Sequence, residues 1–135
     1  MKIYFAASIR SGRDDVGIYQ LLIERLSAFG QVLTEHIGDQ SLSIHGEQKP
    51  SEFIFQRDTD WVREADVVVA EVTTPSLGVG YEIRLGEELG KRVICLYRPQ
   101  SDRKLSAMIL GNPRLNVVEY DGIEDAVEKL KELLA

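Results

Sequence analysis

Cysteine, histidine and proline are scarce in this sequence of 135 residues, which contains one, two and four of them. The single cysteine, Cys95, excludes an internal disulfide and suits a reducing compartment, so we expect a cytoplasmic location. The two histidines and the cysteine lack the spacing of metal ligands, and we expect neither a metal nor a cofactor. Cys95 lies inside a predicted strand, and we interpret it as a core residue.

Long apolar runs and an excess of positive charge are also missing. No run approaches the ~20 residues of a membrane-spanning helix. The opening MKIYFAAS turns polar too soon for a signal peptide, so we expect no membrane partner. The formal net charge of −6 is unfavourable for binding a nucleic acid polymer. This net charge does not exclude a small anionic ligand, because one pocket of an acidic protein can be positive.

The sequence does contain a regular alternation of β-rich and amphipathic segments. We predict strands at 2–7, 31–34, 66–72, 92–97 and 116–120, helices at 16–30, 51–65, 77–90 and 123–135, and one helical turn at 105–110. Gly30 is predicted to end the first helix, and Ser51 to cap the second. The polar segment 35–50 is predicted to be a mobile loop.

This alternation predicts an α/β fold, a flavodoxin-like or Rossmann-like three-layer sandwich formed by one domain over 1–135. Its five-stranded parallel sheet is expected in the order 2-1-3-4-5. Ligands of such sheets bind outside the carboxyl ends of the strands, at the switch point between the first and third strands. Two loops should therefore meet at the ligand site: SIRSGRDD (8–15) and EVTTPSLGVGYE (71–82).

The first loop combines hydroxyl groups, a glycine and guanidinium groups at a strand-to-helix turn. Ser8, Arg10, Ser11, Gly12 and Arg13 could together form a phosphate cradle. The loop matches neither a Walker loop nor a GxGxxG fingerprint, so the signal is weak by itself. A solvated turn with two surface arginines is the competing interpretation.

The second loop leads into a helix whose first turns contain two glycines. Pro75 and Ser76 fit a helix start, and Gly78 and Gly80 follow at once. Glycine costs a helix roughly 1 kcal/mol relative to alanine, so these two suggest that a ligand approaches the backbone closely. Tight packing of helix against strand is the alternative.

Glu82 follows these glycines, where the helix dipole favours an ionised carboxylate. An ionised carboxylate in a partly dry pocket acts as a nucleophile or stabilises charge, and its complement is a second carboxyl of higher pKa. The candidates are Asp58, Asp60 and Glu71. Asp58 shares a helix face with apolar neighbours three before and four after it, whereas Asp60 lies roughly 160° away. A solvated surface charge remains the competing interpretation for each.

Four segments of the chain resemble the 2′-deoxynucleoside 5′-phosphate N-hydrolases of the wider nucleoside 2-deoxyribosyltransferase family: YFAASIRSGRDD, VLTEH, QRDTDWVREADVVVAEVTTPSLGVGYE and CLYRPQSDRKLSAMI. The resemblance covers Lys2 to about Leu110 and is most specific from Ala65 to Glu82. It implies hydrolysis of the N-glycosidic bond of a 2′-deoxynucleoside 5′-monophosphate. The products would be the free base and 2-deoxyribose 5-phosphate.

The resemblance also implies roles for individual residues. Glu82 matches the nucleophile that forms a deoxyribosyl ester, Asp58 the acid that assists departure of the base, and Tyr4 a tyrosine that positions the nucleophile and excludes a 2′-hydroxyl. The remaining matches line the substrate: Ala7, Ser8, Ile9, Arg10, Ser11, Gly12, His36, Ser76, Gly78, Ser106, Ala107 and Met108. Of these, Ala7 and Ser11 replace glycines of the relatives.

The implied assembly is a homodimer in which Ser106 reaches the phosphate bound by the partner subunit. Two other functions stay open. A deoxyribosyltransferase would use the same Glu82 ester and pass the sugar to a second base, and a non-catalytic module would only bind the nucleotide. The sequence leaves the preferred base undetermined.

Overall fold

The computed structural model describes residues 1–9, 15–39, 46–99 and 104–135. The elements follow in the order β1 (Lys2–Ala6), α1 (Val16–Leu26), β2 (Gln31–Val32), the 3-10 helix η1 (Glu35–Gly38), α2 (Ser51–Glu64), β3 (Val67–Glu71), α3 (Leu77–Glu88), β4 (Arg92–Tyr97), α4 (Ala107–Leu110), β5 (Asn116–Glu119) and α5 (Ile123–Leu134). Within the described ranges, no helix is both long and apolar enough to span a bilayer.

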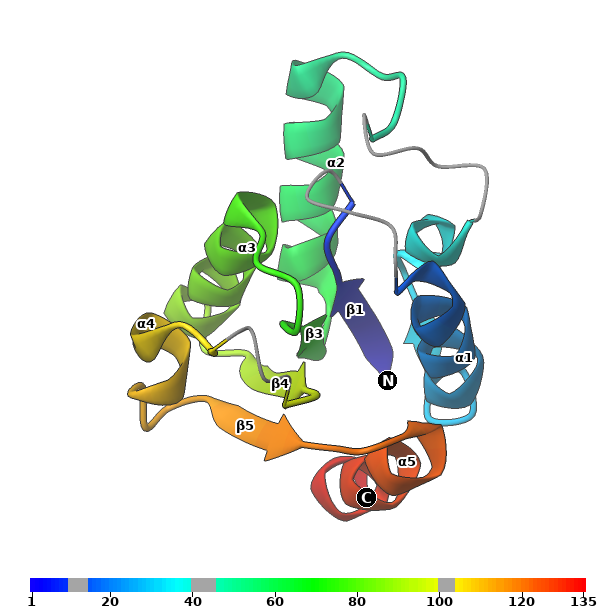
Figure 1. Ribbon diagram of the computed structural model, residues 1–135. Coiled ribbons are helices and arrows are strands. Elements are labelled where there is room, and N and C mark those ends of the chain that lie inside the picture. The colour runs from blue at the N-terminus through cyan, green and yellow to red at the C-terminus, as the bar shows by residue number, and fades with distance from the viewer. Residues whose placement is uncertain (10–14, 40–45, 100–103) are drawn as a thin grey trace.

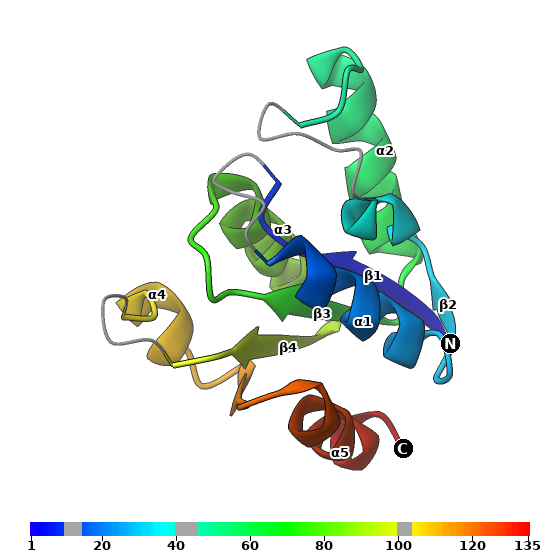
Figure 2. The ribbon, with the colours of Figure 1, turned by 45° about the vertical axis from the view of Figure 1, so that its right-hand side comes forward.

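The five strands form one parallel sheet in the order β2-β1-β3-β4-β5, which confirms the predicted order. Tyr4 of β1 lies beside Val68 of β3, and Ala70 of β3 lies beside Cys95 of β4. Helices α2, α3 and α4 cover one face, and α1 and α5 cover the other (Figure 1 and Figure 2). The predicted three-layer sandwich is therefore confirmed.

Strand β3 is buried along its whole length, as expected for a central parallel strand with helices on both faces. Its side chains alternate between the two faces. Val69 packs in the core under α1 and α5 with Phe5, whereas Val68 packs in the core under α2 and α3 with Tyr4. The same alternation decides on which face a polar residue of β1 or β3 can act.

Two predicted boundaries near the amino-terminal half are wrong. Helix α1 ends at Leu26 rather than at residue 30, and the Ser27 hydroxyl donates to the carbonyl oxygen of Ile23 at 2.8 Å. Strand β2 ends at Val32 rather than at residue 34. The hydroxyl of Thr34 accepts from the Phe5 amide at 2.9 Å and donates to the Phe5 carbonyl at 2.6 Å. These side-chain bonds take the place of backbone hydrogen bonds between β1 and a longer β2.

The segment between β2 and α2 also differs from the prediction. Residues 35–38 form η1, so the segment is not loop throughout, and residues 40–45 lie outside the described ranges. Pro50, not Ser51, precedes α2, and no side chain caps this helix. Ser51 is the first helical residue, where its hydroxyl cannot accept from the amides as a cap would.

Gly86 allows α3 to lie directly on the sheet. A Cβ at this position would lie 2.9 Å from Cγ2 of Val68 and 3.3 Å from Cγ2 of Val93. We expect Gly86→Ala to lower the free energy of unfolding by about 1–3 kcal/mol, because β-branched neighbours cannot turn aside. Gly80→Ala is the matched control on the same helix, since no atom of the described part of the chain lies within 4 Å of its Cβ position. It should raise stability by about 0.4–1 kcal/mol in the same urea titration; equal effects would contradict this packing account.

Candidate active site

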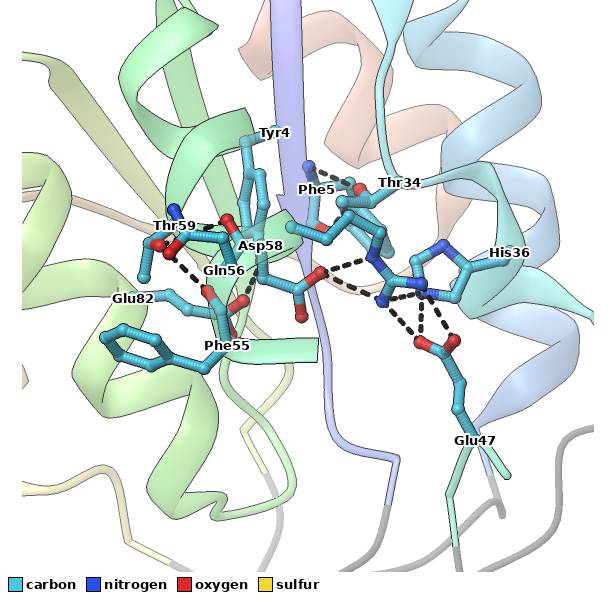
Figure 3. A network of polar contacts seen from close by, with 11 residues as sticks. Tyr4, Phe5, Thr34, His36, Glu47, Phe55, Gln56, Asp58, Thr59 and Glu82 are labelled. Carbon is cyan, nitrogen blue, oxygen red and sulfur yellow. Dashed lines mark hydrogen bonds and ion pairs between the residues drawn. The ribbon is translucent and has the colours of Figure 1, made fainter. Parts of the chain in front are cut away.

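Tyr4 and Glu82 form the centre of the candidate site. Tyr4 is fully buried on the face of β1 that is covered by α2 and α3, and Glu82 is the sixth residue of α3. The Tyr4 hydroxyl donates to Oε2 of Glu82 (Figure 3). Strand β1 and helix α3 thereby hold the carboxyl group from two sides.

The protonation of Glu82 differs from the expectation. Burial raises the pKa of Glu82 to about 8. The helix dipole acts mainly within the first turn, and the sixth residue of α3 lies beyond that turn. The hydrogen bond donated by Tyr4 favours the ionised carboxylate and opposes the effect of burial on the pKa. The carboxyl group is therefore poised to ionise near neutral pH and not far below it.

Asp58 lies on the side of α2 that faces this pair. In Figure 3 its carboxyl group lies between the Tyr4–Glu82 pair and the side chains of Glu47 and His36. Arg57 donates from Nε to Oδ1 of Asp58 at 2.9 Å. Burial raises the pKa of Asp58, and Arg57 counteracts part of that rise. The apolar face predicted around Asp58 is only partly present, because Phe55 is 54% exposed while Val62 is buried.

The other two candidate acids do not belong to this site. Asp60 is exposed and pairs with Arg63 at 3.1 Å, as its place on the helix predicted. Glu71 is fully buried, but the alternation along β3 directs it to the opposite face from Tyr4. There it accepts from the amide of Thr73 at 2.7 Å and from the hydroxyl of Tyr120. Glu71 thus ties the ends of β3 and β5 together.

His36 lies on η1 beside the candidate acid Asp58, where a base contact was expected. Its ring centroid is 5.8 Å from that of Trp61 on α2, and its Nε2 is 2.9 Å from Oε1 of Glu47. Burial lowers the pKa of His36, so the neutral imidazole is favoured. Trp61 packs against His36 and Arg57 and is partly buried.

The residues expected around the phosphate follow β1 and precede α3. Ala7 and Ser8 are buried and Ile9 is partly buried, whereas Arg10, Ser11 and Gly12 lie outside the described residues. The Ser8 hydroxyl is fully buried and has no hydrogen-bond partner in the described part of the chain. Ser76 caps α3 by accepting from the Val79 amide at 3.3 Å, as its position predicted.

The two glycines at the start of α3 are not required by packing. Among the described residues, a Cβ at Gly78 would meet only the Ser76 hydroxyl oxygen, at 3.9 Å, and a Cβ at Gly80 would meet nothing within 4 Å. The alternative of tight helix–strand packing is therefore wrong at both positions. Open space beside them agrees with a ligand or a second chain at this end of α3.

Ser106, Ala107 and Met108 are exposed at the start of the short helix α4. Ser106 and Met108 line a groove of about 630 Å³ between α3 and α4, which Ser76 also lines. Glu82 is directed away from this groove, toward Tyr4 of β1. The structure therefore places Ser106 near Ser76, at the start of α3. It does not place Ser106 near Glu82.

Two charged residues of the site carried no role in the sequence interpretation. Arg57 and Glu47 form an ion pair that also contacts His36 and Asp58. An arginine directly before Asp58 was the available signal, whereas nothing marked Glu47 within a polar segment. Among the described residues, no group of three or more side chains could hold a metal ion.

Comparison with known proteins shows the family to which the chain belongs. The sequence model of the family described as nucleoside 2-deoxyribosyltransferase matches residues 3–122. The 5-hydroxymethyl-dUMP N-hydrolase of Tetraodon nigroviridis is 48% identical over 98% of this chain and 95% of its own. That of Mus musculus is 50% identical over 95% of this chain and 76% of its own. In fold, the chain is similar to a CMP N-glycosidase from Clostridium botulinum, with a TM-score of 0.66 and 18% identity over 98% and 99% of the two chains.

Proposed function

The chain belongs to the nucleoside 2-deoxyribosyltransferase family, and we propose that it hydrolyses the N-glycosidic bond of 2′-deoxynucleoside 5′-monophosphates. The products are the free base and 2-deoxyribose 5-phosphate. The observation that carries this proposal is the Tyr4–Glu82 hydrogen bond at the switch point of the sheet, with Asp58 on the neighbouring helix α2. The names of the similar proteins from Tetraodon and Mus support a nucleotide substrate.

The reaction divides into two steps at the anomeric carbon. Ionised Glu82 attacks C1′ while the C1′–N bond breaks, and its electron pair leaves with the base, which takes a proton from Asp58. Water then attacks C1′ of the glutamyl ester, Asp58 takes the proton of that water, and Glu82 departs as carboxylate. A 2-deoxyribosyl centre ionises readily because it has no electron-withdrawing 2′-oxygen, so two carboxyl groups are sufficient.

Tyr4 has two functions in this proposal. Its hydroxyl group holds Oε2 of Glu82, so that Oε1 is left to attack C1′. The buried ring also occupies the space beside the sugar, where a 2′-hydroxyl group would have to fit. The chain should therefore prefer dGMP to GMP.

Incubation with dGMP alone, and then with dGMP and free adenine, tests the reaction class. Release of guanine without adenine supports the hydrolase, while exchange only in the presence of adenine supports the transferase. Neither release nor exchange, combined with binding, leaves a nucleotide-binding module. A parallel series with 5-hydroxymethyl-dUMP and the matching ribonucleotides examines base and sugar preference.

We further propose a homodimer in which Ser106 contacts the phosphate bound by its partner. The support is an apolar surface around Ser106 in which Leu77 is 97% exposed, Met108 82% and Leu110 62%. Apolar patches of this kind are typical of interfaces between subunits. The cytoplasmic location stays a prediction.

Ser106→Ala is expected to raise KM for dGMP by about 10-fold and to leave kcat nearly unchanged, because a hydroxyl-to-phosphate bond contributes roughly 1.5 kcal/mol. Mixing Glu82→Ala with Ser106→Trp under subunit exchange tests the sharing directly. One pocket of each mixed dimer then contains only wild-type groups and regains activity. A monomer by sedimentation at micromolar concentration, or no recovery after proven exchange, would contradict the shared site.

A further inference from the structure

Arg57 lies between the carboxyl groups of Glu47 and Asp58, both of which are labelled in Figure 3. Its Nη1 donates to Oε2 of Glu47 at 2.8 Å, and its Nη2 pairs with Oε1 of the same carboxylate. Its Nε donates to Oδ1 of Asp58 at 2.9 Å. The side chains of Arg57 and Glu47 are only 17% and 13% exposed, so this ion pair is shielded from water.

The guanidinium group is also held from its other sides. It lies 4.9 Å from the centre of the Trp61 ring, at cation–π distance. His36 contacts the same carboxylate as Arg57, with Nε2 at 2.9 Å from Oε1 of Glu47. The bidentate pairing with Glu47 and the stacking on the indole ring together fix the orientation of the planar guanidinium group.

This arrangement leaves one oxygen of Asp58 free. Arg57 contacts Oδ1, and Oδ2 has no polar contact among the described residues. We propose that Arg57 and Glu47 are positioning residues for Asp58: Arg57 fixes Oδ1, and Glu47 holds Arg57 and neutralises part of its charge, so that Oδ2 can deliver a proton to the leaving base. The assignment of that proton transfer rests on the proposed function.

The role of Glu47 follows from charge balance. Paired with Arg57 alone, Asp58 would be held as a carboxylate and would be a poor acid. The hydrogen bond from Arg57 lowers the pKa of Glu47, whereas burial raises the pKa of Asp58. Glu47 therefore gives up its proton more readily than its usual range would imply, and Asp58 less readily.

The other groups that face Asp58 do not reverse this order. His36 of η1 is favoured in its neutral form, because burial lowers its pKa. Across the site, Tyr4 of β1 and Glu82 of α3 are hydrogen-bonded to each other. Arg57 is therefore the one cation among the described groups around Asp58, and its pairing decides how readily Asp58 binds a proton.

Titration of the Asp58 carboxyl by ¹³C NMR in the ligand-free protein tests the proposal without relying on any activity. Arg57→Gln should raise the pKa of Asp58 by about one unit, because the attractive charge is lost. Glu47→Gln should lower that pKa by about one unit, because the full charge of Arg57 then acts on Asp58. Shifts of the same sign, or no shifts, would overturn the proposal.

Two further variants separate a local effect from a loss of folding. Arg63→Gln is the matched control, since Arg63 lies on the same helix, 53% exposed, and pairs with Asp60 at 3.1 Å. It should leave the pKa of Asp58 unchanged. The double variant Glu47→Gln/Arg57→Gln removes both charges of the ion pair, so that no unpaired charge is left buried. It should raise the pKa of Asp58 as Arg57→Gln does. An unchanged pKa in this folded double variant would also overturn the proposal.

Kinetics on dGMP then show whether the positioning serves the reaction. The limb of the kcat–pH profile that is set by ionisation of Asp58 should move up in Arg57→Gln and down in Glu47→Gln by about the NMR shifts. Arg57→Lys keeps the positive charge but loses the bidentate geometry of the guanidinium group. The limb of its kcat profile should therefore lie at the wild-type pH, while kcat falls about 10-fold or more. NMR shifts of opposite sign without parallel movement of the limb would overturn the link to proton transfer. If wild type does not hydrolyse deoxynucleotides, the proposed function fails, and the titration still decides the positioning.

Discussion

Glu82→Gln is expected to abolish base release from dGMP while leaving the fold intact. Glutamine keeps the shape of the side chain and can still accept from the Tyr4 hydroxyl, but it cannot form the ester with C1′. Loss of a covalent nucleophile costs several powers of ten in rate, on the order of 4 kcal/mol or more. Single-turnover release of guanine, followed by chromatography, measures this loss.

The same substitution should make the protein more stable, and the gain should depend on pH. The pKa of Glu82, about 8 in the folded chain, exceeds that of an unfolded glutamate, so wild type loses stability as the pH rises from about 4.5 to 8. Glu82→Gln removes this loss, and its advantage should grow over that window by up to roughly 3 kcal/mol, at about 1.4 kcal/mol per pKa unit. Urea unfolding at pH 5 and pH 8 measures the difference.

Glu88→Gln provides the control for both effects. Glu88 lies on the same helix, 58% exposed, and pairs with Arg84 on the surface. Its substitution should change neither the rate nor the pH dependence of stability beyond a few tenths of a kcal/mol. Near-normal turnover by Glu82→Gln, with this control unchanged, would contradict the role of Glu82 as nucleophile.

Asp58→Asn is expected to lose activity in proportion to how much the leaving base needs a proton. Guanine leaves poorly without protonation, so single-turnover release from dGMP should fall by about 10²–10⁴-fold. The base of 7-methyl-dGMP already carries a positive charge and departs neutral without a proton. Its release in the first turnover should therefore fall by less than about 10-fold.

The comparison of these two substrates separates proton donation from positioning. An equal loss on both would mean that Asp58 holds the substrate and does not protonate the base. Asp60→Asn, two residues along the same helix and exposed, should change neither rate.

The arrangement of strands and helices could be predicted because hydrophobic periodicity reports which faces are buried. The fully buried β3 and the alternation of β and α segments were sufficient for the order of the sheet. The ends of α1 and β2 could not be predicted in this way, because side-chain bonds of Ser27 and Thr34 to distant or local carbonyls decide them.

Topology predicted where Glu82 would lie, whereas Tyr4 was named through the resemblance to the family. Glu82, Tyr4 and Asp58 lie on elements that flank the switch point, and the structure hydrogen-bonds the first two. The high pKa of Glu82 could not be anticipated, since it is caused by burial, which depends on how the elements pack in the folded chain. Glu47 was missed because the contact with Arg57 joins residues ten apart whose spacing carries no periodic signal.

The most direct measurement of the central claim is a mass spectrum of the protein during turnover. Asp58→Asn with 7-methyl-dGMP should form the ester and hydrolyse it slowly, because water then lacks its base. After an acid quench, we expect the peptide containing Glu82 to gain the mass of one 2-deoxyribose 5-phosphate unit, and Asp58→Asn/Glu82→Gln to show no gain. Release of 7-methylguanine without any adduct, or an adduct on another residue, would contradict the account.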